Sequence, residues 1–173
     1  NAADGLNVGA RKITLSTVGL PAMIRRLAGE DLQITLALSL HGPNQRLREE
    51  LVPWAAKFKL PEVLTAVREY FDRTGREITL EYVMIEGINT LPEHADELAE
   101  IARSLRCNVN LIYYNPVAGL RHAGSAADYR RATKATAAAF RDRLAGRGVN
   151  VHIRPSRGLN IDAACGQLRR REG

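Results

Sequence analysis

Short apolar runs rich in β-branched residues alternate with helical patterns along the chain, and this alternation constrains the fold more than any other feature of the sequence. The continuous apolar run ITLALSL (34–40) is typical of a strand covered on both faces. Four further strands are predicted at 12–16, 77–85, 108–114 and 149–153. Strands that alternate with helices predict an α/β fold with a parallel sheet and right-handed crossovers. A doubly wound sheet and a (β/α) barrel both fit this pattern.

The helical patterns between the strands carry start and stop signals. The predicted helices cover 20–29, 46–51, 61–75, 90–105 and an alanine-rich stretch that ends at Gly146. Thr90 stands three residues before Glu93, a spacing that predicts a capping box. Ser125 is expected to cap the alanine-rich helix. No GxGxxG motif follows the first strand, which disfavours a Rossmann dinucleotide fold.

The size and cysteine content of the chain limit its class. A length of 173 residues suits one domain with a substantial core. No apolar stretch is long enough to cross a bilayer, and the N-terminus lacks the pattern of a signal peptide. Two cysteines cannot form a disulfide scaffold, so we expect a cytoplasmic protein with no membrane partner.

Positive charge is concentrated in the last third of the chain. Residues 1–120 carry 13 basic and 15 acidic side chains, a net charge of −2, whereas residues 121–173 carry 12 basic and 4 acidic, a net charge of +8. Guanidinium groups bind phosphate through paired hydrogen bonds, so this field indicates a nucleic-acid partner. The predicted RNA-binding residues are Arg154, Arg157, Arg169, Arg170 and Arg171. For Arg130, Arg131, Arg141 and Arg143 a solvated helix surface explains the charge equally well.

Polar side chains follow the predicted strands at the points where the strands end. Ser16 ends the first strand, Ser39 and His41 the second, the dipeptide EG (86–87) the third, and Asn115 follows the fourth. Because ligands of parallel α/β folds bind at the carboxyl ends of the strands, these residues predict a site for a small polar ligand. Taken singly, each could instead be a turn residue or a helix cap.

Metal and hydrolase chemistry find little support in the residues. The four histidines and two cysteines show no paired spacing such as CxxC or HExxH, so no metal site is predicted in this chain. Cys107 enters the fourth strand and is expected to be a buried small hydrophobic residue. No G-x-S-x-G elbow is present, which disfavours a serine hydrolase.

Several segments together resemble one family of RNA-modifying enzymes. The segments are ITLSTVGL, LALSLHGPNQRLREELVP, EITLEYVMIEGIN, NLIYYNP and GLNIDAACGQL, of which SLHGPN and DAACGQL are the most specific. In this order and spacing they resemble the C-terminal part of the RlmN/Cfr family of radical S-adenosylmethionine (SAM) enzymes, which methylate an adenine carbon in RNA. The resemblance covers essentially the whole chain.

The resemblance implies a fold, a domain division and a set of site residues. Residues 1–153 would form a partial TIM-like (β/α) barrel that lacks its first strands, and residues 154–173 an arginine-rich segment. The SAM-binding positions carry over to Ser16, Ser39, Leu40, His41 and Asn115. Cys165 matches the cysteine that is methylated during turnover and passes its methyl carbon to adenine. The implied substrates are large-subunit rRNA and tRNA, modified at adenine C2 in RlmN-type enzymes; a Cfr-type enzyme that modifies C8 is the alternative.

The chain departs from the family pattern in one major respect. The CxxxCxxC motif that holds the family's [4Fe–4S] cluster does not occur, so the cluster is expected only in a full-length enzyme. We expect this chain alone to bind no cluster and to perform no methyl transfer. The strand at 12–16 would lack a neighbour, and we expect residues 1–10, another copy of the chain or a missing N-terminal half to cover it. A catalytically silent RNA-binding module and a structural fragment are the alternatives from other functional classes.

Overall fold

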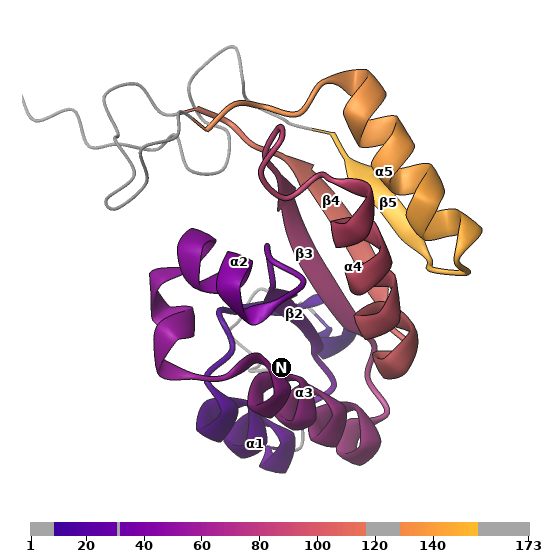
Figure 1. The fold of residues 1–173 in the computed structure, drawn as a ribbon. Coiled ribbons are helices and arrows are strands. Elements are labelled where there is room, and N and C mark those ends of the chain that lie inside the picture. The colour runs from indigo at the N-terminus through magenta and orange to yellow at the C-terminus, as the bar shows by residue number, and fades with distance from the viewer. Residues whose placement is uncertain (1–8, 31, 117–128, 156–173) are drawn as a thin grey trace, which may run out of the picture.

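Five parallel strands form one sheet in the part of the chain that the computed structural model describes, residues 9–30, 32–116 and 129–155 (Figure 1). The strands are β1 (Thr14–Thr17), β2 (Thr35–Ser39), β3 (Ile78–Met84), β4 (Asn108–Tyr113) and β5 (Val151–Arg154). Their spatial order follows the chain order from β1 to β5. A doubly wound sheet would reverse its order at a switch point. The sheet is therefore an open part of a (β/α) barrel, and the predicted α/β partial barrel is confirmed.

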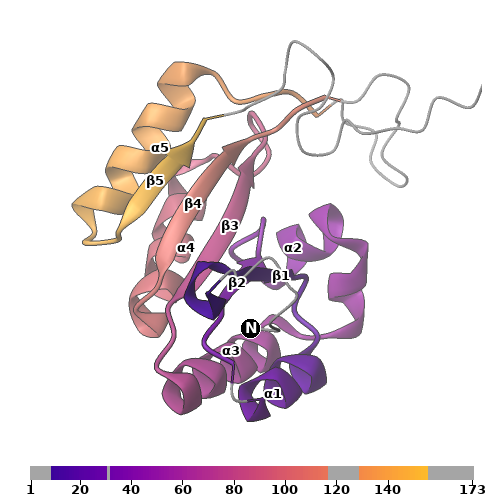
Figure 2. The same cartoon turned by 180° about the vertical axis from the view of Figure 1, so that it is seen from behind.

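Four helices cover one face of this sheet. They are α1 (Pro21–Gly29), α3 (Leu60–Thr74), α4 (Pro92–Leu105) and α5 (Lys134–Gly146). The two opposite views place the helices on the same side of the strands (Figures 1 and 2), as expected when every crossover has the same hand. Helix α1 packs on α3 and α4 packs on α5, so the helices form the outer layer of a barrel wall. None of the described helices combines the length and apolarity that crossing a bilayer requires.

The strands divide their side chains between a core face and an inner face. On β3 the even-numbered residues from Ile78 to Met84 are buried against the helices, whereas Thr79, Glu81 and Val83 are half-buried on the other face. The register aligns four polar residues across the inner face, namely Ser39, Glu81, Asn110 and His152. The inner face of this partial barrel is thus polar, which suits a wall that surrounds a ligand.

The start of α4 differs from the predicted capping box. Leu91 is the N-cap residue, and no side chain caps this helix. The hydroxyl of Thr90 instead accepts a hydrogen bond from the Gly87 amide and donates one to the Ile85 carbonyl, both at 3.2 Å. Thr90 therefore stabilises the turn after β3. Pro92 supplies the start of the helix, since its fixed φ suits the first helical position.

The start of α5 also differs from the sequence prediction. The helix begins at Lys134, and the hydroxyl of Thr133 accepts the hydrogen bond of the Thr136 amide at 3.0 Å. Residues 129–132 are not helical, so Ser125 does not cap this helix. Ser125 itself lies outside the described residues. A serine and a threonine both make good caps, and local sequence alone did not distinguish between them.

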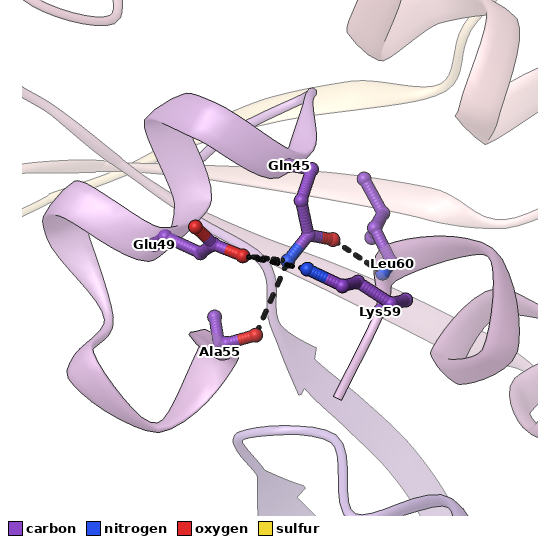
Figure 3. Close-up of polar contacts among 5 residues, drawn as sticks. All are labelled: Gln45, Glu49, Ala55, Lys59 and Leu60. Atoms are coloured by element: carbon purple, nitrogen blue, oxygen red, sulfur yellow. Dashed lines mark hydrogen bonds and ion pairs between the residues drawn. The ribbon is translucent and has the colours of Figure 1, made fainter. Parts of the chain in front are cut away.

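A small helical lobe connects β2 to α3. It consists of α2 (Gln45–Leu51) and the 3-10 turn η2 (Pro53–Lys57), and the side chain of Gln45 fastens it (Figure 3). The Gln45 amide nitrogen donates to Glu49 at 2.5 Å and to the Ala55 carbonyl at 3.2 Å, and its oxygen accepts from the Leu60 amide at 2.6 Å. One side chain thus joins α2, η2 and α3, which keeps the lobe at the carboxyl end of β2.

Strand β1 is an open edge of the sheet. Residues 14–16 are exposed, and the apolar side chains of Ile13 and Leu15 are 43% and 39% exposed. The short helix η1 (Ala10–Lys12) precedes the strand and leaves it uncovered, and residues 1–8 lie outside the described residues. Among the described strands, β1 pairs only with β2, so the expected unpaired edge is present.

Gly19, in the loop after β1, is a position that no other residue should fill. Its φ is +91°, and a Cβ added there would lie 2.6 Å from Val63 Cγ1 and 3.1 Å from Leu38 Cδ1. We expect Gly19→Ala to reduce the free energy of unfolding by about 2–4 kcal/mol through steric overlap and backbone strain. Urea denaturation followed by circular dichroism measures this. Gly146→Ala is the matched control, because a Cβ at Gly146 meets open space. Equal free energies of unfolding in the two variants would contradict the expectation.

Candidate ligand site at the carboxyl ends of the strands

Four of the predicted ligand residues lie at one edge of the sheet. Ser16 lies in β1, Ser39 ends β2, His41 follows it, and Asn115 follows β4. Because all the strands are parallel, their carboxyl ends meet at this edge. Strand β3 lies between Ser16, Ser39 and His41 on one side and Asn115 on the other. No described hydrogen bond joins the four side chains directly to one another.

Two hydrogen bonds to β3 and one to Asn89, in the loop after β3, hold His41 in place. Its backbone has a φ of 57°, the left-handed region that a residue with a Cβ rarely adopts. The His41 amide donates to the Glu81 carbonyl at 3.3 Å, and its ring Nδ1 accepts from the Val83 amide at 3.2 Å. The carbonyl of His41 accepts from Asn89 Nδ2 at 2.9 Å. Strained residues that are fixed in this way cluster at functional sites.

Leu40 contributes to the site through its backbone. Its side chain is fully buried in the core, and its amide donates to the same Glu81 carbonyl at 3.1 Å. The Leu40 amide therefore ties the chain that leaves β2 to β3, between the candidate residues Ser39 and His41.

Burial keeps the His41 ring uncharged. Removal from water, reinforced by the nearby Arg48 cation and partly opposed by hydrogen bonding to the Glu81 backbone, lowers the pKa of His41 from 6.5 to about 4. A histidine whose pKa is lowered in the folded state favours folding in its neutral form. Its contribution is therefore complete above pH 6.5 and is lost as the pH falls toward 4. At neutral pH the site contains a neutral imidazole.

Arg48 and Asn89 support this site and were not predicted from the sequence. Arg48 of α2 is fully buried and donates from Nη2 to the Val18 carbonyl, just beyond β1. Asn89 is fully buried too, and its amide nitrogen donates to the carbonyls of His41 and Val83. Arg48 holds the loop that follows β1. Asn89 holds the residue after the loop's turn out of β2, His41, against the end of β3.

Asn115 is positioned from the other side of β3. Its side chain is buried, and its Oδ1 accepts a hydrogen bond from Arg131 Nη1 at 2.8 Å. The Arg131 guanidinium also lies 4.3 Å over the ring centre of Tyr113, and its backbone pairs with Ile85. Asn115 thus keeps its amide nitrogen as the free donor of the side chain among the described contacts.

Glu86, from the EG pair after β3, has a structural role instead of the expected place in the site. Its carboxylate accepts from the Thr133 amide at 2.8 Å and from the Thr136 hydroxyl at 2.7 Å. A carboxylate at the first turn of α5 is favourable because it satisfies free amides and complements the helix dipole. Glu86 therefore joins the turn after β3 to α5.

The predicted RNA-binding and methyl-accepting residues are mostly outside the described residues. Arg154 is the last residue of β5 and is exposed. Arg157, Cys165 and Arg169–Arg171 fall in 156–173, which the structure does not describe. The relation between Cys165 and the strand ends stays a prediction.

Cys107 is buried, as predicted. It is 8% exposed, and its thiol donates to the Ala102 carbonyl at 3.6 Å. Burial raises the pKa of Cys107 to about 12. Across the described stretches, no group of three or more His, Cys, Asp or Glu residues could hold a metal ion.

The two thiols are expected to differ in reactivity. Because a thiol reacts as its thiolate, Cys107 should resist a thiol reagent in the folded chain. In Cys165→Ser we expect no reaction with Ellman's reagent until denaturant is added, whereas Cys107→Ser should retain one reactive thiol. Rapid labelling of the folded Cys165→Ser variant is the opposite outcome and would show that Cys107 is accessible.

The curated proteins that resemble this chain share one name. No protein-family model matches the chain. It is 48% identical over 164 residues to the probable dual-specificity RNA methyltransferase RlmN of Thermosynechococcus vestitus, which covers 95% of this chain and 47% of that protein. The corresponding protein of Bacillus cytotoxicus is 45% identical over 172 residues. The chain thus spans about half the length of the curated relatives it matches.

Solved structures agree with these relatives. A radical SAM methyltransferase from Sphaerobacter thermophilus superimposes with a TM-score of 0.86 at 45% identity, covering 94% of this chain and 46% of that one. A domain of pyruvate-formate lyase-activating enzyme from Bacteroides vulgatus superimposes with a TM-score of 0.59 at 14% identity, which supports the fold alone.

Proposed function

We propose that this chain, which is 45–48% identical to RlmN RNA methyltransferases over nearly its whole length, is the C-terminal part of a radical SAM enzyme that methylates C2 of adenosine in large-subunit rRNA and tRNA. The single observation that carries the proposal is the 45–48% identity to RlmN proteins over nearly the whole chain. The side chains gathered at the strand ends are consistent with it, since ligands bind there in (β/α) barrels.

SAM is assigned to the carboxyl ends of β1, β2 and β4. Ser16 and Ser39 would offer hydroxyl groups, His41 a neutral ring, Leu40 its backbone, and Asn115 an amide. These groups fit SAM chemically, because its ribose, adenine and methionine parts present both hydrogen-bond donors and acceptors. The polar inner face supports the same assignment, since Glu81 lies beside Ser39 in the sheet register and Asn110 lies beside Glu81.

Cys165 is assigned as the methyl acceptor. Its thiolate would attack the methyl carbon of the SAM sulfonium, forming a sulfur–carbon bond and releasing S-adenosylhomocysteine. Arg157, Arg169 and Arg170 lie close to it in sequence, and their positive charge would favour the thiolate. The same arginines, with Arg154 and Arg171, would bind the phosphate backbone of the RNA.

The [4Fe–4S] cluster of the family does not fit the residues of this chain. Its two cysteines are far apart in sequence, and Cys107 is buried with a raised pKa. We therefore assign the cluster to the N-terminal half of a full-length enzyme, which would also pair with the open edge at β1. Alone, this chain would transfer no methyl group. A cytoplasmic location agrees with the small number of cysteines.

Binding measurements separate this proposal from its alternatives. We expect the chain to bind SAM in equilibrium dialysis with radiolabelled ligand, and Asn115→Ala to weaken that binding. RNA binding should weaken steeply with salt, by an amount set by the number of phosphate contacts. RNA binding without SAM binding would instead support a silent RNA-binding module, and failure to bind either ligand would support a structural fragment. Transfer to C8 by the full-length protein would indicate a Cfr-type enzyme.

A further inference from the structure

We propose that the Val83 amide and the buried Arg48 guanidinium together hold His41 as a neutral ring protonated on Nε2, so that His41 serves the site as a fixed hydrogen-bond donor. This assignment rests on the proposed function in one respect only, since it takes SAM to be the molecule that receives the hydrogen bond. It makes Arg48 a positioning residue, one that acts through His41.

The tautomer follows from the geometry at β3. A backbone amide can only donate, so the Nδ1 atom that it contacts at 3.2 Å must carry a lone pair. In a neutral imidazole the proton then lies on Nε2. Hydrogen bonds to Glu81 and Asn89 hold the His41 backbone, and the contact of Nδ1 with the Val83 amide holds the ring.

The uncharged state follows from burial and from Arg48. The Arg48 side chain is fully buried, and its Nε and Nη1 atoms have no hydrogen-bond partner among the described residues. A buried cation that has no counter-ion among the described residues disfavours a second positive charge nearby. The other charged side chains on β3 and α2 are Glu81, which accepts from Asn110 at 3.1 Å, and Arg46, Glu49 and Glu50 of α2, of which Glu49 contacts Gln45 and Lys59.

A positioning role explains why an arginine is buried at this place. Helix α2 begins four residues after His41, and the backbone of Gly42 packs so closely on Arg48 that a Cβ at Gly42 would lie 2.6 Å from the Arg48 amide nitrogen. The guanidinium extends from there to the Val18 carbonyl behind β1. One side chain therefore connects α2, which follows the loop that carries His41, with the loop that follows Ser16 and the end of β1.

Nuclear magnetic resonance of the ring nitrogens tests the tautomer without any ligand. In the full chain labelled with 15N-histidine, the His41 signals are those that disappear in His41→Gln. We expect a protonated Nε2 and an unprotonated Nδ1 at pH 7, with titration to the cation only near pH 4. A protonated Nδ1, or a His41 that titrates near 6.5, would overturn the proposal whether or not the chain binds SAM.

Variants of Arg48 test the electrostatic part. Arg48→Met should shift the His41 titration to higher pH, because the neighbouring positive charge is removed while the burial of the ring remains. Arg48→Lys keeps the charge and should leave the titration nearer to that of the unchanged protein. Equal titrations in both variants would contradict the role of Arg48. If Arg48→Met does not fold, the His41 titration is compared between Arg48→Lys and the unchanged protein at pH 4–6.5. A His41 titration at much higher pH in the lysine variant counts against the proposal.

A pair of His41 variants tests the donor itself. Glutamine places an amide nitrogen near the position of Nε2, whereas asparagine retains only an acceptor near Nδ1. We expect His41→Gln to bind SAM ~10-fold more tightly than His41→Asn, the change produced by about one hydrogen bond. Equal affinities would overturn the donor role. If the unchanged protein binds no SAM, the proposed function fails, while the nitrogen spectra still decide the tautomer.

Discussion

Replacement of Asn89 by aspartate is expected to lower the free energy of unfolding by about 3–5 kcal/mol, because it places a carboxylate against two buried carbonyl oxygens. The Asn89 amide nitrogen donates to the Val83 carbonyl at 2.6 Å and to the His41 carbonyl at 2.9 Å, and its oxygen accepts from the Ile85 amide at 2.8 Å. The residue is fully buried. An ionised aspartate can donate to neither carbonyl, and a protonated one to a single carbonyl.

The defect should depend on pH in a defined direction. Burial beside carbonyl oxygens would raise the pKa of the new carboxyl above its unfolded value of about 3.9. The folded state then favours the protonated form, so the variant is least destabilised below that pH and loses stability as the pH rises. Chemical denaturation at pH 4 and at pH 7, followed by circular dichroism, measures the difference. A defect of the same size at both pH values would contradict this explanation.

Asn150→Asp is the control for this experiment. Asn150 contacts Asn108 in an exposed pair next to β5, so water can hydrate an added charge there. We expect its free energy of unfolding to stay within about 0.5 kcal/mol of the unchanged protein. Similar losses in both variants would mean that the network around Asn89 contributes little.

Periodicity predicted the strands and helices well because burial follows it closely. The run 77–85 became β3, and its alternating residues divide between the core and the inner face as the pattern requires. The choice between a barrel and a doubly wound sheet depends on which strands become neighbours. That is a property of distant segments, and it became visible only in the strand order from β1 to β5.

Local signals failed where a side chain had a stronger partner elsewhere. Thr90 has the spacing of a capping residue, but its hydroxyl is engaged in the turn after β3. Glu86 has the place of a ligand residue, but the free amides at the start of α5 take its carboxylate. In each case the competing contact lies in the folded structure and has no signal in the neighbouring sequence.

The supporting residues of the site were missed for a related reason. Arg48 stands in QRLREEL, which resembles an exposed helix, and Asn89 stands in GINT, which resembles an ordinary turn. Their partners are far away in the chain, since Arg48 reaches back 30 residues to Val18 and Asn89 reaches back 48 residues to His41. Alternation placed Ser39 and His41 at the site, but nothing in it indicates what fixes them.

Cys165→Ala in the full-length enzyme is expected to reduce methyl transfer to RNA by at least ~10³-fold, the scale of loss seen when a nucleophile is removed. The proposed route needs a sulfur atom that accepts the methyl group from SAM and carries it to adenine. Alanine has no such atom and no lone pair to replace it. Transfer of radiolabelled methyl groups from SAM to rRNA measures the loss, and mass spectrometry of the digested protein should find S-methylcysteine at position 165 before substitution.

Cys107→Ala is the matched control, since it removes the other thiol of the chain. Cys107 lies in the core beside Ala102, and its raised pKa makes it a poor nucleophile at neutral pH. We expect a small loss of stability, about 1 kcal/mol, and undiminished methyl transfer. If SAM binding persists in Cys165→Ala while transfer stops, the cysteine acts in the chemical step. Unchanged transfer in Cys165→Ala would instead mean that the methyl group reaches the RNA without this sulfur, and the route through Cys165 would be wrong.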